Sequence, residues 1–304
     1  MADAASGSLR AIFYALGANL GIAVAKYTAA IWTGSGSMLA EAIHSTADCV
    51  NQLLLLLGMR EARRPVSAEH PLGHHRAAYF WSMVVALLLF FMGGVFSVYE
   101  GIERLRHPSA LENGLVAMLV LAVAAALEGF SLAGAMREIR KHAGGKPFLR
   151  WFRESRRSEL MVIAGEDIAA LAGLALAFAA VVATLLTGNP FWDAIGTIGV
   201  GVVLMVIAVA VMVEVKSLIV GESAAPEVHA EIESFLAAQP EVQAVLNIIT
   251  LAWGERIVVA VKARMAEVDT ITGSELVRRI NAVEERLQAR FPAAYWVFFE
   301  PDER

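Results

Sequence analysis

Charged residues and cysteine are scarce in this sequence. Lys, Arg, Asp and Glu make up 18% of the 304 residues, whereas hydrophobic residues make up 57%, and the mean hydropathy is +0.58. Soluble domains carry about 25% charged residues, so the composition excludes an ordinary soluble domain and predicts a polytopic membrane protein. Cys49 is the single cysteine, which excludes an intrachain disulfide and a cysteine-rich metal cluster.

Several motifs of enzymes are also missing. The sequence contains no H-E-x-x-H, no G-x-S-x-G and no glycine-rich phosphate loop, so it lacks the signatures of common metalloproteases, serine hydrolases and nucleotide-binding proteins. Its basic residues gather in loops between apolar stretches, where such residues act as orientation signals. The sequence therefore gives no support for nucleic-acid binding.

What the sequence does contain is a series of long apolar stretches. A helix of about twenty apolar residues crosses a bilayer, and windows of that kind lie at 10–32, 38–59, 78–102, 111–136, 159–186 and 194–220. Arginine and lysine are abundant in the loops after the second and fourth windows, whereas only Arg104 and Arg106 lie on the opposite side. The positive-inside rule then predicts six transmembrane helices with both termini in the cytosol or in the equivalent compartment of an organelle.

The last part of the chain has a different periodicity. After Gly221 the pattern predicts a helix, two strands, a second helix and a last strand, at 226–238, 242–252, 256–266, 273–290 and 294–300. This α-β-β-α-β order predicts a small α+β domain with its helices on one face of a sheet. We therefore expect a transmembrane domain at 1–220 and a cytosolic C-terminal domain at 221–304.

A polar stripe runs along the second apolar stretch. Glu41, His44, Asp48 and Asn51 recur at steps of three, four and three, so an α-helix lines them up on one face. Each ionised side chain at the centre of a membrane helix costs roughly 2.5 to 3.5 kcal/mol, so such groups need partners, water or an ion. His44 and Asp48, one helical turn apart, are spaced as a pair of metal ligands.

The fifth apolar stretch carries a second polar interruption, Gly165-Glu166-Asp167. Counted along the helices, Asp48 and Asp167 both lie near the middle of the membrane. Carboxylates and an imidazole suit a borderline divalent ion such as Zn²⁺. The alternative is that these groups pair within the bundle or reach water at a helix end; this alternative weighs more for Glu166, whose side chain points about 100° away from that of Asp167.

Other polar residues allow two interpretations each. Asn19 in the first stretch either reaches the cavity that would contain Asp48 and Asp167 or bonds a neighbouring helix. Glu128 in the fourth stretch either relays protons or pairs with Lys26. The loop after the second stretch includes His70 and His74, which form either a second, exposed metal site that collects ions or a surface loop of hydrogen-bonded histidines.

Taken together, these residues resemble the cation diffusion facilitator family, over nearly the whole chain. The stretch 34–48, GSGSMLAEAIHSTAD, resembles the family's signature from the first loop into the second helix. His70-Pro71-Leu72-Gly73 is similar to its HP-x-G loop, and the tail to its cytosolic domain. The resemblance implies a six-helix homodimer that moves zinc or related divalent ions against protons by alternating access.

The resemblance also assigns residues. His44 and Asp48 match the H-x-x-x-D ligands of the family's second helix, and Asp167 matches the aspartate of the H-x-x-x-D in its fifth. The position four before Asp167 is Ile163, which cannot bind a metal, so Glu166, Asn19 or water completes the ligand shell. The pair Glu166-Asp167 resembles the branch that includes the vertebrate mitochondrial zinc transporter. Losing a nitrogen ligand favours ions that prefer oxygen, so Mn²⁺, Fe²⁺ and Co²⁺ are candidate transported ions besides Zn²⁺.

We therefore expect a transporter rather than an enzyme, without a prosthetic group, that exchanges a divalent ion for protons and exports it from the cytosol. His44 and Asp48 are the expected proton carriers, because metal ligands must be deprotonated to bind and an imidazole titrates near neutral pH. We expect it in a bacterial inner membrane or an organelle membrane, in contact with lipid. A membrane-embedded metal-dependent enzyme, in which the metal activates water, and a cation channel are the alternatives.

Overall fold

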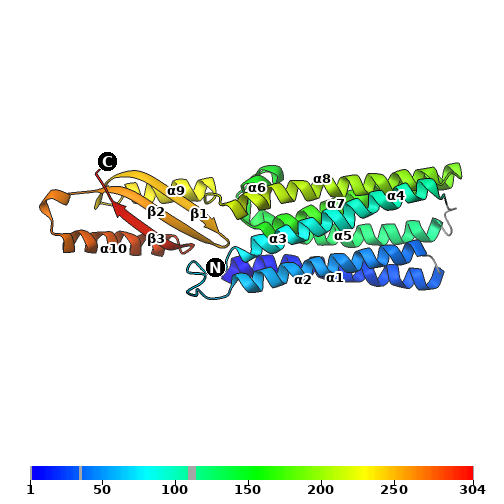
Figure 1. Ribbon diagram of the computed structural model, residues 1–304, viewed down its shortest axis with the longest axis horizontal. Helices are drawn as coiled ribbons and strands as arrows, with labels where there is room; N and C mark the ends of the chain where they lie inside the picture. Colours follow the sequence, from blue (N-terminus) through cyan, green and yellow to red (C-terminus); the bar gives the residue numbers. More distant parts are fainter. Residues whose placement is uncertain (1, 34–35, 109–113, 304) are drawn as a thin grey trace.

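The computed structural model describes residues 2–33, 36–108 and 114–303, and the side chains of 2–11, 15, 29–30, 32–44 and 268 lie outside that description. The molecule is elongated (Figure 1), with a bundle of long helices at one end and a small sheet flanked by two helices at the other. The N-terminus lies at the end of the bundle that faces the sheet.

The bundle is built from long helices that run roughly along the long axis. They are α1 (Ala2–Thr33), α2 (Gly36–Ala62), α3 (Ala77–Leu88), which continues through the π-helical segment η1 (Leu89–Val95) into α4 (Phe96–Arg106), α5 (Gly114–His142), the short α6 (Phe148–Glu154), α7 (Ser158–Thr187) and α8 (Phe191–Val220).

Four of these helices are long and apolar enough to cross a membrane, among the residues that the structure describes. They are Ala77–Arg106, Gly114–His142, Ser158–Thr187 and Phe191–Val220. The prediction of a polytopic helical membrane protein is therefore confirmed. The count of six membrane helices, which adds α1 and α2, stays a prediction.

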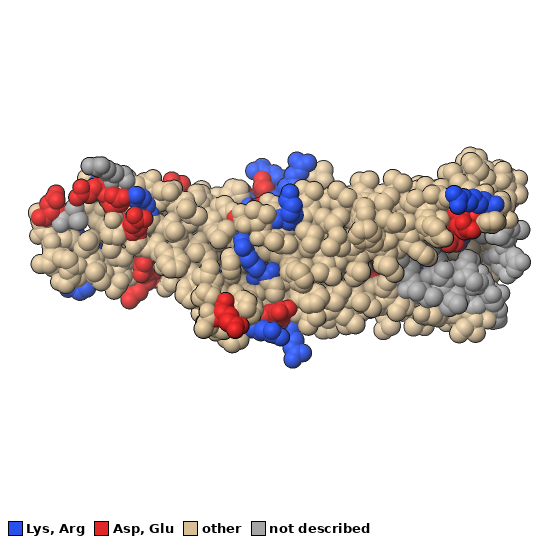
Figure 2. Space-filling model, in the orientation of Figure 1, with Lys and Arg blue, Asp and Glu red and all other residues tan. Residues whose placement is uncertain are grey.

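The surface of the bundle is largely apolar. Large side chains such as Ile31 and Leu115 are about four-fifths exposed, at 83% and 80%. Figure 2 shows that Lys, Arg, Asp and Glu gather where the bundle meets the sheet and toward the ends of the molecule, leaving the described surface between almost uncharged on this face. Exposed apolar surface of this extent is unfavourable in water and fits a surface covered by lipid.

Helix α7 lies at the centre of the bundle. It packs against α8, α5, α3 and α1, and every residue from Ser158 to Asp167 is buried. Gly165 permits this packing, because a Cβ there would lie 2.8 Å from Cγ2 of Val211 in α8. The close approach of the two helices carries the neighbouring Glu166 and Asp167 into the interior.

The C-terminal unit contains α9 (Pro226–Ala237), β1 (Val242–Trp253), β2 (Arg256–Met265), η2 (Val268–Thr270), α10 (Gly273–Arg290) and β3 (Ala294–Pro301). The sheet has the order β1-β2-β3, with β1 antiparallel to β2 and β3 parallel to β2. The start of α10 is fixed by Thr272, whose hydroxyl accepts the Glu275 N–H at 3.2 Å, as expected of an N-cap. The predicted α-β-β-α-β order is confirmed.

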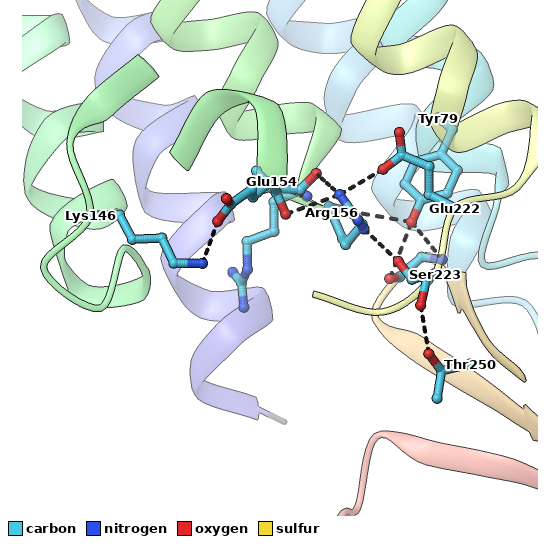
Figure 3. A network of polar contacts seen from close by, with 10 residues as sticks. Tyr79, Lys146, Glu154, Arg156, Glu222, Ser223 and Thr250 are labelled. Carbon is cyan, nitrogen blue, oxygen red and sulfur yellow. Dashed lines mark hydrogen bonds and ion pairs between the residues drawn. The ribbon is translucent and has the colours of Figure 1, made fainter. Parts of the chain in front are cut away.

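The turn between β1 and β2 contacts the start of α3. The Tyr79 hydroxyl accepts a hydrogen bond from the Gly254 N–H at 3.0 Å, and the Arg76 guanidinium lies 4.1 Å from the centre of the Trp253 ring. Tyr79 is drawn with the surrounding contacts in Figure 3. Two parts of the chain that lie far apart in sequence are thereby joined at one point.

Ion pairs hold the connection between α8 and α9 against the bundle (Figure 3). The Arg156 guanidinium donates to the Ser223 carbonyl at 2.7 Å and pairs with Glu222 at 2.6 Å. Lys146 pairs with Glu154 at 2.6 Å and with Glu227 of α9 at 2.7 Å. Hydrogen bonding to Lys146 lowers the pKa of the Glu154 and Glu227 carboxyls, so these two contacts are present above the ordinary carboxyl pKa and are lost as the pH falls through the lowered pKa.

We expect Gly254→Ala to weaken the attachment of the C-terminal unit. Gly254 has a φ of +65°, and a Cβ there would lie 2.4 Å from the carbonyl oxygen of His75. The backbone conformation costs an L-residue about 1 to 2 kcal/mol, and the overlap adds about 1 to 3 kcal/mol. Thermal unfolding in detergent and the rate of proteolysis within 221–225 measure the effect.

Gly144→Ala is the matched control, because its φ of +56° is similar while nothing lies within 4 Å of the added Cβ. We expect Gly254→Ala to lower the unfolding temperature and to speed cleavage more than Gly144→Ala does. Equal effects of the two variants would contradict the idea that the turn is held against the bundle.

Candidate functional site

A cavity of about 230 Å³ lies inside the helical bundle. Its polar lining comes from two groups of residues. One group, from α1, α2, α5 and α7, consists of Asn19, Lys26, Ser45, Asp48, Glu128 and Glu166. The other, from α4 and the start of α8, includes Ser97, Glu100, Arg104, Asp193 and Thr197. The rest of the lining is mainly apolar, so the cavity has polar groups in two places and is apolar between them.

Asn19 and Asp48 both line this cavity. Asn19 is buried, and with Ile22 and Lys26 it forms the face of α1 that lines the cavity, as the spacing of three and four residues requires. Asp48 is half-buried and lines the cavity from α2. The side chain of His44, one turn before Asp48, lies outside the described residues.

Glu166 also lines the cavity, and two amides of α2 orient its carboxylate. Asn51 Nδ2 donates to Oε1 at 3.3 Å, and Gln52 Nε2 donates to Oε2 at 2.9 Å. All three side chains are buried. Asn51 belongs to the polar stripe of the second stretch, so one member of that stripe holds Glu166 rather than facing open space.

Asp167 points in another direction. It is 1% exposed, is absent from the cavity lining that the structure describes, and accepts a hydrogen bond from the Ser131 hydroxyl of α5 at 3.0 Å. Consecutive residues of an α-helix are about 100° apart, so Glu166 and Asp167 bond to different helices, although the charge of Asp48 acts on both. The structure thus brings Asp48 and Glu166 to one cavity and Asp167 to α5.

No group of three or more His, Cys, Asp and Glu side chains is arranged as a metal site among the described residues, which do not include the His44 side chain. The described carboxylates of the cavity are therefore an incomplete ligand set. Free Cys49 follows Asp48 and is half-buried, and it too is absent from the described lining.

His70 and His74 are brought together in the loop between α2 and α3. Their ring centroids are 4.1 Å apart, and His70 is exposed while His74 is half-buried. Neither lines the cavity as described. The next residue, His75, packs against the turn at Gly254, and burial lowers the pKa of its imidazole. His70 and His74 thus form a pair at the end of the bundle that faces the sheet.

The other end of the cavity is occupied by an ion-pair cluster. Arg104 of α4 contacts Glu100 at 3.1 Å and Asp193 at 2.5 Å. Asp193 lies in the first turn of α8, as a helix-start residue would. The cluster ties α4 to α8 at the end of the bundle away from the sheet.

Sequence reasoning missed Gln52, Ser131 and the part that Arg104 takes in the cavity. Ser131 lies three residues after Glu128, on the same face of α5, which is a signal that could have identified it. Gln52 lies four residues after Asp48, on the same side of α2, so the three-and-four spacing could have identified it as well.

Comparisons with known proteins agree with this geometry. A family model described as the cation efflux transmembrane domain matches residues 12–220. The chain is 36% identical over 225 residues to "Proton-coupled zinc antiporter SLC30A9, mitochondrial" of Xenopus laevis, which covers 73% of this chain and 40% of that protein. It is 32% identical over 233 residues to "Metal tolerance protein C4" of Arabidopsis thaliana, which covers 75% of this chain and 50% of that protein.

A shorter match is to "Zinc transporter ZitB" of Escherichia coli, 32% identical over 118 residues, which covers 39% of this chain and 37% of that protein. The chain therefore spans at most about half the length of these relatives. The family and these relatives are cation transporters and not enzymes. From the match over residues 12–220 and these identities, the chain belongs to the cation efflux family, the cation diffusion facilitators, near the branch of SLC30A9.

Proposed function

We propose that the protein is a metal/proton antiporter that carries zinc and exports it from the cytosol. The observation that carries the proposal is that Asp48 and Glu166, from two different membrane helices, line one buried cavity. Carboxylates in such a place need a cation or protons. The printed names of two relatives, a proton-coupled zinc antiporter and a zinc transporter, support zinc as the ion and protons as the counter-ion.

The proposed topology has six membrane helices, α1 and α2 included, with both termini in the cytosol or the equivalent compartment. Residues 1–220 form the transport domain and 221–304 a cytosolic domain that pairs with its copy in a homodimer. The basic residues near the sheet, Arg60, Arg63, Lys146 and Arg150 among them, support this orientation. The membrane is a bacterial inner membrane or that of an organelle.

His44 and Asp48 are the proposed ligands from α2, with Asn19 as a further oxygen donor. From α7 we propose Glu166 as the ligand in the conformation described here and Asp167 as the ligand in a second conformation, reached when Ser131 no longer holds it. The amides that orient Glu166 and the hydroxyl that holds Asp167 support such an exchange. His70 and His74 are proposed as a second ion site in the loop, supported by the distance of 4.1 Å between their ring centroids.

Proton exchange follows from the ligands. A carboxyl group or an imidazolium must lose its proton to bind a metal ion, and the resulting carboxylate or imidazole can take a proton up when the ion leaves. We propose His44 and Asp48 as these carriers, and the imidazole, with its ordinary pKa of about 6.5, titrates in the working range.

We expect His44→Ala to remove most of the pH dependence of metal uptake, because an imidazole ordinarily titrates near neutral pH and His44 is a proposed proton carrier. Uptake into vesicles, measured from about pH 6 to 8, tests this. Uptake that stays metal-stimulated and equally pH-dependent in the variant would refute the role of His44.

Transport in proteoliposomes with a pH dye inside tests the proposed function. Zn²⁺, Mn²⁺, Fe²⁺ and Co²⁺ are each added outside to protein of known orientation. Zinc uptake from the side of the C-terminal unit that is accompanied by loss of protons from the vesicle interior supports the proposal. The rates for the four metals rank the ions. Current without proton movement would show a channel, and hydrolysis of a peptide or lipid would show an enzyme; either result would overturn the antiporter.

A further inference from the structure

Lys26 and Glu128 are two buried charged residues of the cavity that the proposed ligand set does not use. Lys26 comes from α1 and Glu128 from α5, two helices that pack together. Both side chains line the cavity, and each is 6% exposed. The ammonium of Lys26 and the carboxylate of Glu128 lie close enough to interact electrostatically. Burying charge is unfavourable unless opposite charges compensate one another, and the ammonium offsets part of the negative charge at Glu128.

The charges around this pair define its effect. Asp48 and Glu166 supply the other carboxylates of the described lining at this end of the cavity, and Arg104 is engaged with Glu100 and Asp193 at the far end. Asp167, from α7, is the further acid nearby and bonds Ser131 instead. Lys26 is thus the basic residue of the described lining that lies among the carboxylates.

The pair changes how much negative charge a bound ion meets. When all groups are ionised, Lys26 offsets one of the four carboxylates that act on one another here, and three negative charges remain; the four are Asp48, Glu128, Glu166 and Asp167. Without the ammonium the ion would meet all four negative charges. Charge interactions in a protein interior are several times stronger than in water, and transport requires binding that is weak enough for the ion to leave.

We propose that Lys26 sets the affinity of the cavity for the transported ion. The positive charge of Lys26, which acts on Glu128, limits how tightly a divalent cation binds and allows the ion to be released. Lys26 does not contact the ion in this role; it acts by reducing the negative charge that the ion meets. The inference rests on the proposed function, because it concerns the same cavity and the same ion.

Four variants and the wild type test this role. They are Lys26→Gln, Lys26→Arg, Glu128→Gln and the double variant Lys26→Gln with Glu128→Gln. Zinc affinity is measured on the purified full chain by titration against a chelator, and zinc transport is measured in proteoliposomes. Lys141→Gln is the control, since it removes the same charge from a side chain that is 57% exposed.

We expect Lys26→Gln to bind zinc at least about tenfold more tightly and to transport it more slowly, because release becomes limiting. Glu128→Gln, which removes one negative charge near the ion, is expected to bind at least about tenfold more weakly. The double variant and Lys26→Arg are expected to stay within about threefold of wild type, and Lys141→Gln to match it. The double variant buries no unpaired charge, so it and Glu128→Gln decide the matter if Lys26→Gln alone does not fold.

Two results would overturn the proposal. One is that Lys26→Gln binds zinc no more tightly than wild type. The other is that the zinc affinity of the double variant is no closer to that of wild type than the affinity of Glu128→Gln is. If transport fails while the affinities follow the expected order, the antiporter is wrong and the role of Lys26 in binding stands. If wild type transports zinc and all four variants bind alike, the role of Lys26 is wrong and the antiporter stands. A wild type that binds no zinc overturns both.

Discussion

Asp48→Asn is expected to abolish zinc-driven proton movement and to lower zinc uptake at least about a hundredfold. Asp48 lines the cavity from α2 and is the carboxylate of the H-x-x-x-D motif at 44–48. Removing one charge of a buried, desolvated charge contact costs about 2 to 5 kcal/mol, and about 2.8 kcal/mol already corresponds to a hundredfold change. The amide keeps the shape of the side chain, so the loss reports the charge rather than the packing.

The measurement is zinc uptake into proteoliposomes with a pH dye inside. Cys49→Ala is the matched control, because Cys49 is the next residue of the same helix, is half-buried and does not belong to the described lining. We expect this control to transport like wild type. If Asp48→Asn still drove protons with zinc at a comparable rate, Asp48 would be neither a ligand nor a proton carrier, and the proposed mechanism would be abandoned.

Glu166→Gln and Asp167→Asn are expected to differ, although they remove the same charge from neighbouring residues. Glu166 lines the cavity and is oriented by Asn51 and Gln52, so its loss is expected to weaken zinc binding at least about a hundredfold. Asp167 bonds Ser131, so its loss is expected to leave binding within about threefold and to lower turnover at least about tenfold, because the second conformation lacks its ligand.

Titration of zinc against a chelator gives the affinities of these two variants, and vesicle uptake gives their turnover. Each variant is the control of the other, since charge and helix are the same. Weaker binding in Asp167→Asn than in Glu166→Gln would show that Asp167 is the ligand in the binding conformation, as the family motif indicated. The assignment of Glu166 drawn from the cavity would then be wrong.

Much of the fold was predictable because it depends on local patterns. The apolar windows predicted the membrane helices that the structure contains at 77–106, 114–142, 158–187 and 191–220. In the C-terminal unit, alternation predicted β1 and β2 to within one or two residues, and the order of the elements followed. Burial of apolar side chains at intervals of two or 3.6 residues is a property of the chain itself, so tertiary contacts were not needed to recognise it.

The site was predictable only in part. Asp48 and Asn19 both line the cavity. The polar spacing on a helix predicts which of its residues share a face, but it left Asn19 between this cavity and a bond to a neighbouring helix. The contact of Gly254 with Tyr79 joins residues that are 175 positions apart, and no pattern in the sequence links them. The same holds for Arg104 and Asp193, 89 positions apart.

By itself, the sequence determined that this is a polytopic helical membrane protein of the cation efflux family with a small C-terminal sheet, and that carboxylates lie within its membrane helices. Only the tertiary structure decided that Glu166 faces the cavity while Asp167 faces α5, and that Lys26 and Glu128 share that cavity. The physical reason is that a sequence fixes the angle between residues of one helix, whereas the rotation of that helix against its neighbours is set by side-chain packing, here by the close approach of α7 to α8 at Gly165.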